Sequence, residues 1–132
     1  MAIRSLLIDT NAYSALLRGN KEVAEVFEKT ERLVFPFIVV AELLAGFRLG
    51  SREHHNREAL FSLLQSHNTD ILYPTAATLD VYAGIFADLR KKGTPIPTND
   101  LWIAALAIEH QFPLYSFDAH FASVSRLTLI RS

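Results

Sequence analysis

Short apolar runs alternate with helix-like segments along the whole chain of 132 residues, and this alternation limits the fold more than any other feature. The apolar runs have the length of strands and lie at 6–8, 33–37, 70–73, 114–117 and 127–130. Parallel strands need a crossover between them, usually a helix, and strands covered on both faces are apolar throughout. The sequence therefore predicts an α/β fold in which helices cover a short, mainly parallel sheet.

The segments between these runs carry helical periodicity. They cover 10–17, 21–32, 39–47, 51–65, 75–92 and 100–110. In the longest of them, apolar residues at helical spacing predict a buried stripe. That stripe comprises Leu79, Tyr82, Ala83, Phe86 and Leu89. No linker or repeat interrupts the pattern, and the length suits one domain, so we expect a single domain over 1–132.

The composition excludes several classes of function. The chain has no cysteine, which excludes disulfides, thiolate zinc sites and cysteine catalysis and agrees with a reducing, cytoplasmic location. No run approaches the roughly 20 apolar residues that cross a bilayer, so no membrane association is expected. The net charge of -1 provides no general attraction for nucleic acid, which would need a local patch or a bound metal.

Four acidic residues lie in unusual places. Glu42 is the only charged residue in the apolar segment 33–47, and Asp9 closes the first apolar run. Asp100 begins an alanine-rich helix-like segment, and Asp118 follows the fourth apolar run. Taken one at a time, each has a structural explanation, which is solvent exposure for Glu42 and helix capping or the helix dipole for the others.

The expected topology brings these four acids together. In a parallel sheet, residues that follow strands lie at the carboxyl edge, and the first turns of the connecting helices lie there too. Four like charges in one crevice repel one another unless divalent cations neutralise them. With oxygen ligands and no cysteine, one or two Mg²⁺ or Mn²⁺ ions are expected rather than zinc. Such a site supports metal-assisted hydrolysis of a phosphodiester.

Polar residues beside the acids are candidates for orienting the carboxylates or the water around a metal. They are Thr10, Asn11, Asn99 and Ser116. Local capping of helices explains them equally well. His120 lies two residues after Asp118, but packing or capping is the favoured role for it.

Four motifs occur in order along the chain. They are Leu-Ile-Asp-Thr-Asn at 7–11, Val-Ala-Glu-Leu at 40–43, Pro-Thr-Asn-Asp-Leu-Trp-Ile-Ala at 97–104 and Ser-Phe-Asp-Ala-His-Phe at 116–121. In this ordered set the chain resembles the VapC-type PIN domains, the toxin half of bacterial and archaeal toxin–antitoxin pairs. That family usually has Thr where Ser116 stands and often a basic residue where Phe117 stands, so a cationic contact to RNA is not expected from position 117.

The resemblance implies a PIN-like three-layer α/β/α sandwich formed by one PIN domain, with endoribonuclease activity. The metal-site carboxylates that it implies are Asp9, Glu42, Asp100 and Asp118. It further implies that Asn11 and Ser116 support them. The partners that it implies are an RNA substrate, a cognate antitoxin and a second copy of the chain, with DNA contacted only through the antitoxin.

The sequence offers weaker candidates for substrate and partner contacts. Single-stranded or structured RNA needs cations at the rim of the site, and Arg18, Arg48 and Arg52 are expected on loops or helix ends near it. An antitoxin helix could dock on apolar residues of the early helices. These residues are Leu16, Leu17, Leu43, Leu44 and Phe47. Solvated surface charge and ordinary core packing are the competing interpretations of the two sets.

Two other functions are compatible with the sequence. An Asp after the first strand, here Asp9, also serves as the nucleophile of phosphatases and phosphotransferases. Against this, position 11 is Asn, where such enzymes commonly need a second acid. The other is a non-catalytic PIN scaffold that acts only through its partner or DNA, although loss of several acids would mark such a scaffold and none is lost here.

Overall fold

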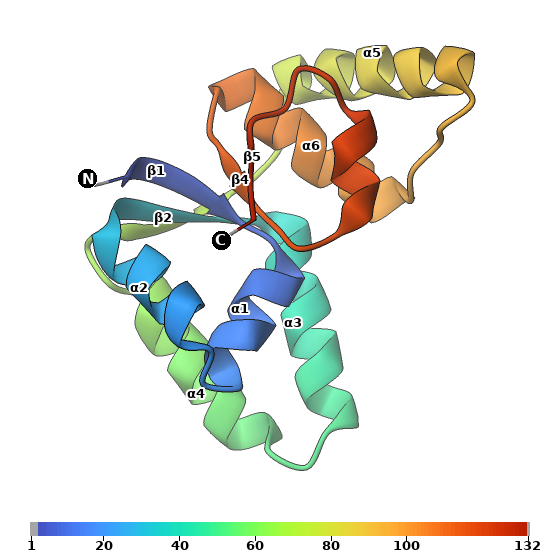
Figure 1. Ribbon diagram of the computed structural model, residues 1–132. Helices are drawn as coiled ribbons and strands as arrows, with labels where there is room; N and C mark the ends of the chain where they lie inside the picture. Colours follow the sequence, from blue (N-terminus) through green and yellow to red (C-terminus); the bar gives the residue numbers. More distant parts are fainter. Residues whose placement is uncertain (1–2, 132) are drawn as a thin grey trace.

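The structure, a computed structural model, describes residues 3–131, and within them five strands form one parallel sheet (Figure 1). The strands are β1 (Ile3–Ile8), β2 (Thr30–Pro36), β3 (Thr69–Leu72), β4 (Leu114–Tyr115) and β5 (Leu129–Ile130). Their order in the sheet is β3-β2-β1-β4-β5, and every pair is parallel. The first strand in the chain is therefore the central one.

Helices cover both faces of this sheet, as the sequence predicted. They are α1 (Thr10–Leu17), α2 (Lys21–Lys29), α3 (Phe37–Leu49), α4 (Glu53–Leu64), α5 (Ala76–Lys92) and α6 (Thr98–His110), followed by the short 3-10 helix η1 (Ala119–Ser123). Figure 1 shows α1 to α4 below the sheet and α5 and α6 above it. The result is the expected three-layer α/β/α sandwich.

The centre of the sheet is fully buried. Leu6, Leu7 and Ile8 of β1 are 0% exposed, and Leu7 pairs with Val34 on one side and with Leu114 on the other. Three consecutive buried apolar residues require cover on both faces of the strand, because successive side chains point to opposite faces. This explains why the strands are apolar throughout instead of alternating with polar residues.

One predicted boundary is wrong. The helix expected over 21–32 ends at Lys29, and β2 begins at Thr30. The Thr30 side chain donates a hydrogen bond of 2.6 Å to the carbonyl of Val26, which satisfies a free group at the end of α2. From there the chain pairs with β1, in the register Ile3 to Thr30. Strand pairing therefore overrides the helical pattern of these last residues.

The buried stripe predicted for the longest helix is also partly wrong. Leu89 is buried as expected, but Leu79 and Phe86 are 56% and 45% exposed. The buried face instead carries Thr78, whose hydroxyl donates to Oε1 of Glu109 in α6 at 2.5 Å. Tyr82 also packs against the core, whereas Ala83 is exposed and Ile85 is buried. The buried face is therefore rotated from the predicted stripe, and hydrophobic periodicity could not show the polar contact of Thr78 on it.

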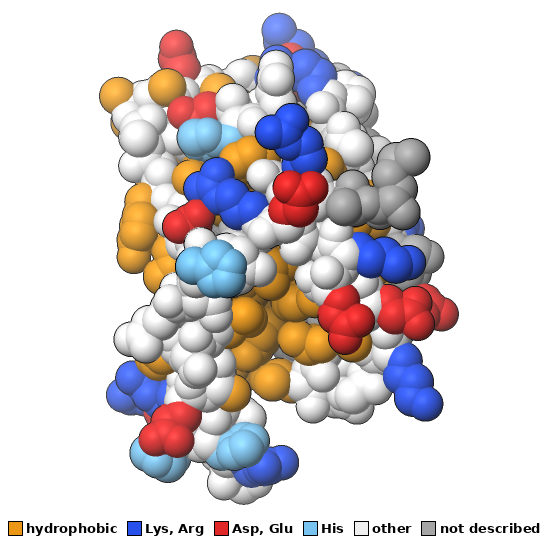
Figure 2. All heavy atoms as spheres, turned by 90° about the vertical axis from the view of Figure 1, so that its left-hand side faces the viewer, with side chains coloured by type: hydrophobic (Ala, Val, Ile, Leu, Met, Phe, Trp, Pro, Cys, Tyr) orange, Lys and Arg blue, Asp and Glu red, His pale blue; other side chains and the backbone are white. Residues whose placement is uncertain are grey.

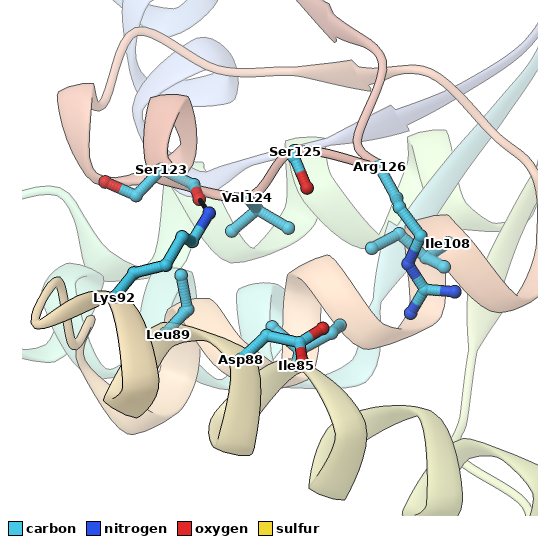
Figure 3. Close-up of a pocket in the computed structure, with 9 residues that line it drawn as sticks. All are labelled: Ile85, Asp88, Leu89, Lys92, Ile108, Ser123, Val124, Ser125 and Arg126. Carbon is cyan, nitrogen blue, oxygen red and sulfur yellow. Dashed lines mark hydrogen bonds between the residues drawn. The ribbon is translucent and has the colours of Figure 1, made fainter.

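The C-terminal segment packs on α5 and α6 around a small pocket (Figure 3). Lys92 at the end of α5 donates a hydrogen bond of 2.8 Å to the carbonyl of Ser123, the last residue of η1. This contact ties η1 to α5. None of the four acids lines this pocket, so the pocket is separate from the site described below.

Among residues 3–131, no helix combines the length and the apolar character that a membrane crossing requires.

We expect Thr78→Val to lower the free energy of unfolding by about 1–3 kcal/mol, because the partly buried Glu109 carboxylate loses its shortest hydrogen bond and the backbone N–H of Thr75 loses its acceptor. Urea denaturation monitored by circular dichroism measures the change. Thr128→Val, at an exposed position, is the matched control and should leave stability unchanged. Equal stability of the two variants would contradict the anchoring role of Thr78.

Candidate active site

The four acids lie near the point in the sheet where the chain switches from one side of β1 to the other. The chain moves from β1 outward to β2 and β3, and then returns to place β4 on the other side of β1. In open α/β sheets, the crevice at such a switch point, beyond the carboxyl ends of the strands, is where ligands bind. Asp9 directly follows β1, and Ser116 directly follows β4. The first of the predicted acids is therefore at this crevice.

Asp9 is held by two hydrogen bonds. Its Oδ1 accepts from the backbone N–H of Thr10 at 2.8 Å, and its Oδ2 accepts from the hydroxyl of Ser116 at 2.6 Å. Asp9 is the N-cap of α1 and is only 5% exposed. Asp9 thus caps α1 and also belongs to the acidic cluster. The two hydrogen bonds fix the direction of its carboxylate.

The loop after β4 is fastened to the start of α1. The hydroxyl of Ser116 accepts a hydrogen bond of 3.0 Å from the backbone N–H of Asp118. The side-chain oxygen of Asn11 accepts from the backbone N–H of Phe117 at 3.1 Å. Ser116 therefore contacts Asp9 with its donor and Asp118 with its acceptor, so it sets the spacing of two acids.

Glu42 points into the same crevice from the second turn of α3. The hydroxyl of Thr10 donates to its Oε1 at 2.6 Å, and the side-chain amide of Asn99 donates to its Oε2 at 3.1 Å. These contacts join α1, α3 and α6 through one carboxylate. All four predicted supporting residues thus have contacts that orient site groups.

Asp100 and Asp118 are joined by His120. The Nδ1 atom of His120 lies 2.9 Å from Oδ2 of Asp100 and 3.1 Å from Oδ1 of Asp118. One ligand atom from each of these three residues lies within 4.8 Å of the other two. Asp118 is also the N-cap of η1, since its Oδ1 accepts from the backbone N–H of His120 at 2.9 Å.

Charge interactions connect the four acids in pairs, Asp9 with Asp100 and Glu42, and Asp100 with Asp118 and Glu42. Burial raises the pKa of Asp9 from 3.8 to about 6, against the lowering effect of the Ser116 and Thr10 hydrogen bonds, and the charges of Asp100 and Glu42 raise it further. Burial also raises the pKa of Asp100, and the charges of Asp118 and Glu42 act in the same direction. The hydrogen bond from His120 to Asp100 raises the pKa of that histidine.

The donor set fits a hard divalent cation. Carboxylate oxygens are the ligands that Mg²⁺ and Mn²⁺ prefer, and a bound positive charge favours the ionised forms of Asp9 and Asp100, whose pKa values burial raises. Asp100, Asp118 and His120 form the tightest group of possible ligands. Asp9 and Glu42 lie near enough for their charges to act on Asp100.

The expected position of the three arginines is wrong. Arg18 is the C-cap of α1, about 12 Å along the helix axis from Thr10. Arg48 lies in the last turn of α3, and Arg52 is the N-cap of α4, which follows it. Helices α1 and α3 begin at the site and run away from it. Arg18 and Arg48 are at the C-terminal ends of these helices, and Arg52 follows α3, so all three lie far from the acids.

The expected docking surface on the early helices is only partly available. Leu43 and Phe47 are 3% and 7% exposed and belong to the core. Leu16 and Leu44 are partly buried, and Leu17 is 40% exposed. Because α3 packs against β2 and β3 on its apolar side, two of the five candidates have no surface to offer a partner.

Comparison with known proteins agrees with this geometry. The sequence profile of the PIN domain matches residues 6–127. The chain belongs to the PIN-domain family. It is 34% identical over 106 residues to "Ribonuclease VapC1" of Haemophilus influenzae strain R2866, covering 77% of this chain and 78% of that protein. It is 31% identical over 134 residues to "VapC ribonuclease Mb1587" of Mycobacterium bovis, covering 96% of both.

Solved structures extend the likeness to the whole fold. The structure of VapBC-1 from nontypeable Haemophilus influenzae superposes with a TM-score of 0.83 at 27% identity, covering 96% of each chain. The resemblance to VapC-type PIN domains is therefore confirmed. PIN-domain nucleases generally depend on divalent metal ions, in agreement with the acidic donor set.

His120 is the site residue that the sequence interpretation underrated. It does take part in a capping turn, but its ring also contacts two of the acids. The signal that could have revealed it is the Asp-x-His spacing, because an Asp at an N-cap accepts from the backbone two residues later and so brings that side chain close.

The raised pKa of Asp9 makes the metal-free protein less stable as pH rises. Below about pH 4 both folded and unfolded chains are protonated at Asp9; above this the unfolded chain loses the proton first, so stability falls until pH passes about 6. The loss totals about 3 kcal/mol. The Asp9→Asn variant has no carboxyl group at this position and therefore does not undergo this loss of stability.

In a chelating buffer, Asp9→Asn should therefore be more stable than the natural protein at pH 7 and similar to it at pH 4. Urea denaturation at intervals between these values measures the difference. Asp80→Asn, on the exposed side of α5, should follow the natural protein. Parallel stability curves for Asp9→Asn and the natural protein would show that Asp9 is not held in a raised-pKa environment.

Proposed function

We propose that this chain is a divalent-metal-dependent endoribonuclease and the toxin member of a toxin–antitoxin pair, acting as a single PIN domain. The observation that supports this most strongly is the meeting of four carboxylates from four distant segments at the switch point of the sheet. The relatives that share the fold and about a third of the residues are named ribonucleases. Cleavage of RNA, the activity in their names, is a reaction that these carboxylate ligands can support.

The proposed metal-site carboxylates are Asp9, Glu42, Asp100 and Asp118. When bound, one or two Mg²⁺ or Mn²⁺ ions supply a Lewis acid that polarises the phosphate and acidifies a water molecule. The ions also reverse the local field, since an unoccupied cluster of carboxylates repels RNA. The oxygen-rich donor set and the absence of cysteine favour these two ions over zinc.

The chain's own residues hold the carboxylates in place for this reaction. Ser116 keeps Asp9 and Asp118 at a set spacing, and Thr10 and Asn99 hold both oxygens of Glu42. Preorganised ligands of this kind reduce the reorganisation needed when substrate binds. Thr10, Asn11, Asn99 and Ser116 are thus proposed as positioning residues.

RNA would reach the site past an aromatic residue. Phe117 directly precedes Asp118 and is 38% exposed, so a base beside the cleaved phosphate can stack on it. Arg18, Arg48 and Arg52 lie at the far ends of α1 and α3 and are proposed to contact only more distant parts of an RNA chain. Each is exposed to solvent.

The proposed partners are a cognate antitoxin and a second copy of the chain. Only the antitoxin would contact DNA. The similar Haemophilus structure is a VapBC-1 complex. Figure 2 shows apolar side chains gathered in a hollow between α2 and α4. Partly exposed apolar residues on these helices include Val26, Phe27, Phe61 and Leu64. This hollow suits an apolar helix of an antitoxin.

The phosphatase alternative receives no support from the geometry. Both carboxylate oxygens of Asp9 accept hydrogen bonds, and the residue is 5% exposed. The second acid that such enzymes commonly need is also missing, because position 11 is Asn and its side-chain oxygen accepts from the backbone N–H of Phe117.

We expect Asp100→Asn to reduce RNA cleavage at least about a hundredfold and to weaken Mn²⁺ binding, because a charged ligand is lost while the fold is kept. Labelled RNA incubated with Mg²⁺ and resolved on a sequencing gel measures cleavage, and calorimetry measures binding. Asp80→Asn is the matched control. Cleavage at the natural rate by Asp100→Asn, or cleavage that persists in excess EDTA, would refute the proposed function.

A further inference from the structure

The imidazole of His120 occupies a place that the four acids leave open. Its Nδ1 atom is 2.9 Å from an Asp100 oxygen and 3.1 Å from an Asp118 oxygen. The side chain is about half exposed, with 52% of its surface accessible, while that of Asp100 is only 14% exposed. His120 is thus the most exposed member of the group that it forms with Asp100 and Asp118.

The spacing of these atoms is that of ligands around one metal ion. Two adjacent ligands of an octahedral ion, each at about 2.1 Å, are about 3 Å apart. The distances from Nδ1 to the two carboxylate oxygens, 2.9 and 3.1 Å, both agree with that value. One ligand atom from each of the three residues lies within 4.8 Å of the other two, which is a spacing that a single cation can bridge.

Backbone hydrogen bonds position the residue that carries the ring. The backbone N–H of His120 donates to Asp118, and the backbone N–H of Asp118 donates to Ser116. At the other end of η1, the carbonyl of Ser123 accepts from Lys92. These contacts hold the backbone of η1 at both ends and so place the Cβ of His120 beside Asp118.

We propose that His120 is a nitrogen ligand of the metal ion held by Asp100 and Asp118, and that it gives the site a preference for Mn²⁺ over Mg²⁺. The inference rests on the proposed function. Mg²⁺ takes oxygen ligands almost exclusively, whereas Mn²⁺, as a transition-metal ion, accepts an imidazole nitrogen beside its oxygen ligands more readily. Nδ1 would bind the ion through its lone pair, so any proton held on Nδ1 would pass to solvent when the ion binds.

Electron spin-echo envelope modulation of the Mn²⁺-loaded protein tests the bond directly. The expected spectrum shows modulation from a directly coordinated ¹⁴N nucleus, and this changes to the ¹⁵N pattern when the protein is made with ¹⁵N-histidine. A histidine that only orients the carboxylates gives no such coupling. The measurement uses the natural protein, so it does not depend on the folding of a variant.

A variant tests the preference between ions. His120→Ala should weaken Mn²⁺ binding about tenfold or more while changing Mg²⁺ binding, measured by competition against Mn²⁺, by less than about threefold. His67→Ala, at an exposed position beside β3, is the matched control and should change neither. The nitrogen modulation should also disappear in His120→Ala and persist in His67→Ala.

The outcomes separate this inference from the proposed function. Tight Mn²⁺ binding without nitrogen modulation would overturn the role of His120 and leave the carboxylate site intact. Equal losses of Mn²⁺ and Mg²⁺ affinity in His120→Ala would overturn the claimed preference. Failure of the natural protein to bind either ion would overturn the metal site itself and the proposed function with it.

Discussion

The burial of carboxylates close to one another at the carboxyl end of the central strand is the constraint on which the site depends. Burial raises the pKa of Asp9 and Asp100, and the neighbouring negative charges act in the same direction. Hydrogen bonds from Ser116 and the Thr10 backbone to Asp9, and from His120 to Asp100, offset this only in part. The folded chain is therefore arranged for a positive ion, whose binding relieves the strain that the fold creates.

The sheet topology is what makes this arrangement possible. With β1 in the centre and β4 beside it, the residues after both strands share one edge of the sheet. The first turns of α3 and α6 lie at the same edge, because connecting helices run back antiparallel to the strands. Asp9 and Asp118 are thus neighbours in space although they are separated by most of the chain. A rigid, fully buried central strand holds this edge in place.

Most of the fold and the acidic cluster could be predicted from the sequence, because apolar runs and the rule for parallel sheets depend on local pattern and topology alone. Glu42 illustrates this, since one charge in an apolar segment must face a polar partner, and it does. The failures have particular causes. Thr78 lies on the buried face of α5 because of its polar contact with Glu109. Arg18 lies at the end of α1 that is far from the site. His120 reaches the site through the capping turn that begins at Asp118. Each depends on three-dimensional contacts that periodicity does not encode.

The most direct test of the central claim is a crystal structure of the protein soaked with Mn²⁺, with the ion located by its anomalous scattering. The account predicts a peak at the β1–β4 edge of the sheet, with carboxylate oxygens of Asp9, Asp100 or Asp118 at about 2.2 Å from it. Well-ordered carboxylates with no anomalous peak among them, or a peak only elsewhere on the molecule, would contradict it.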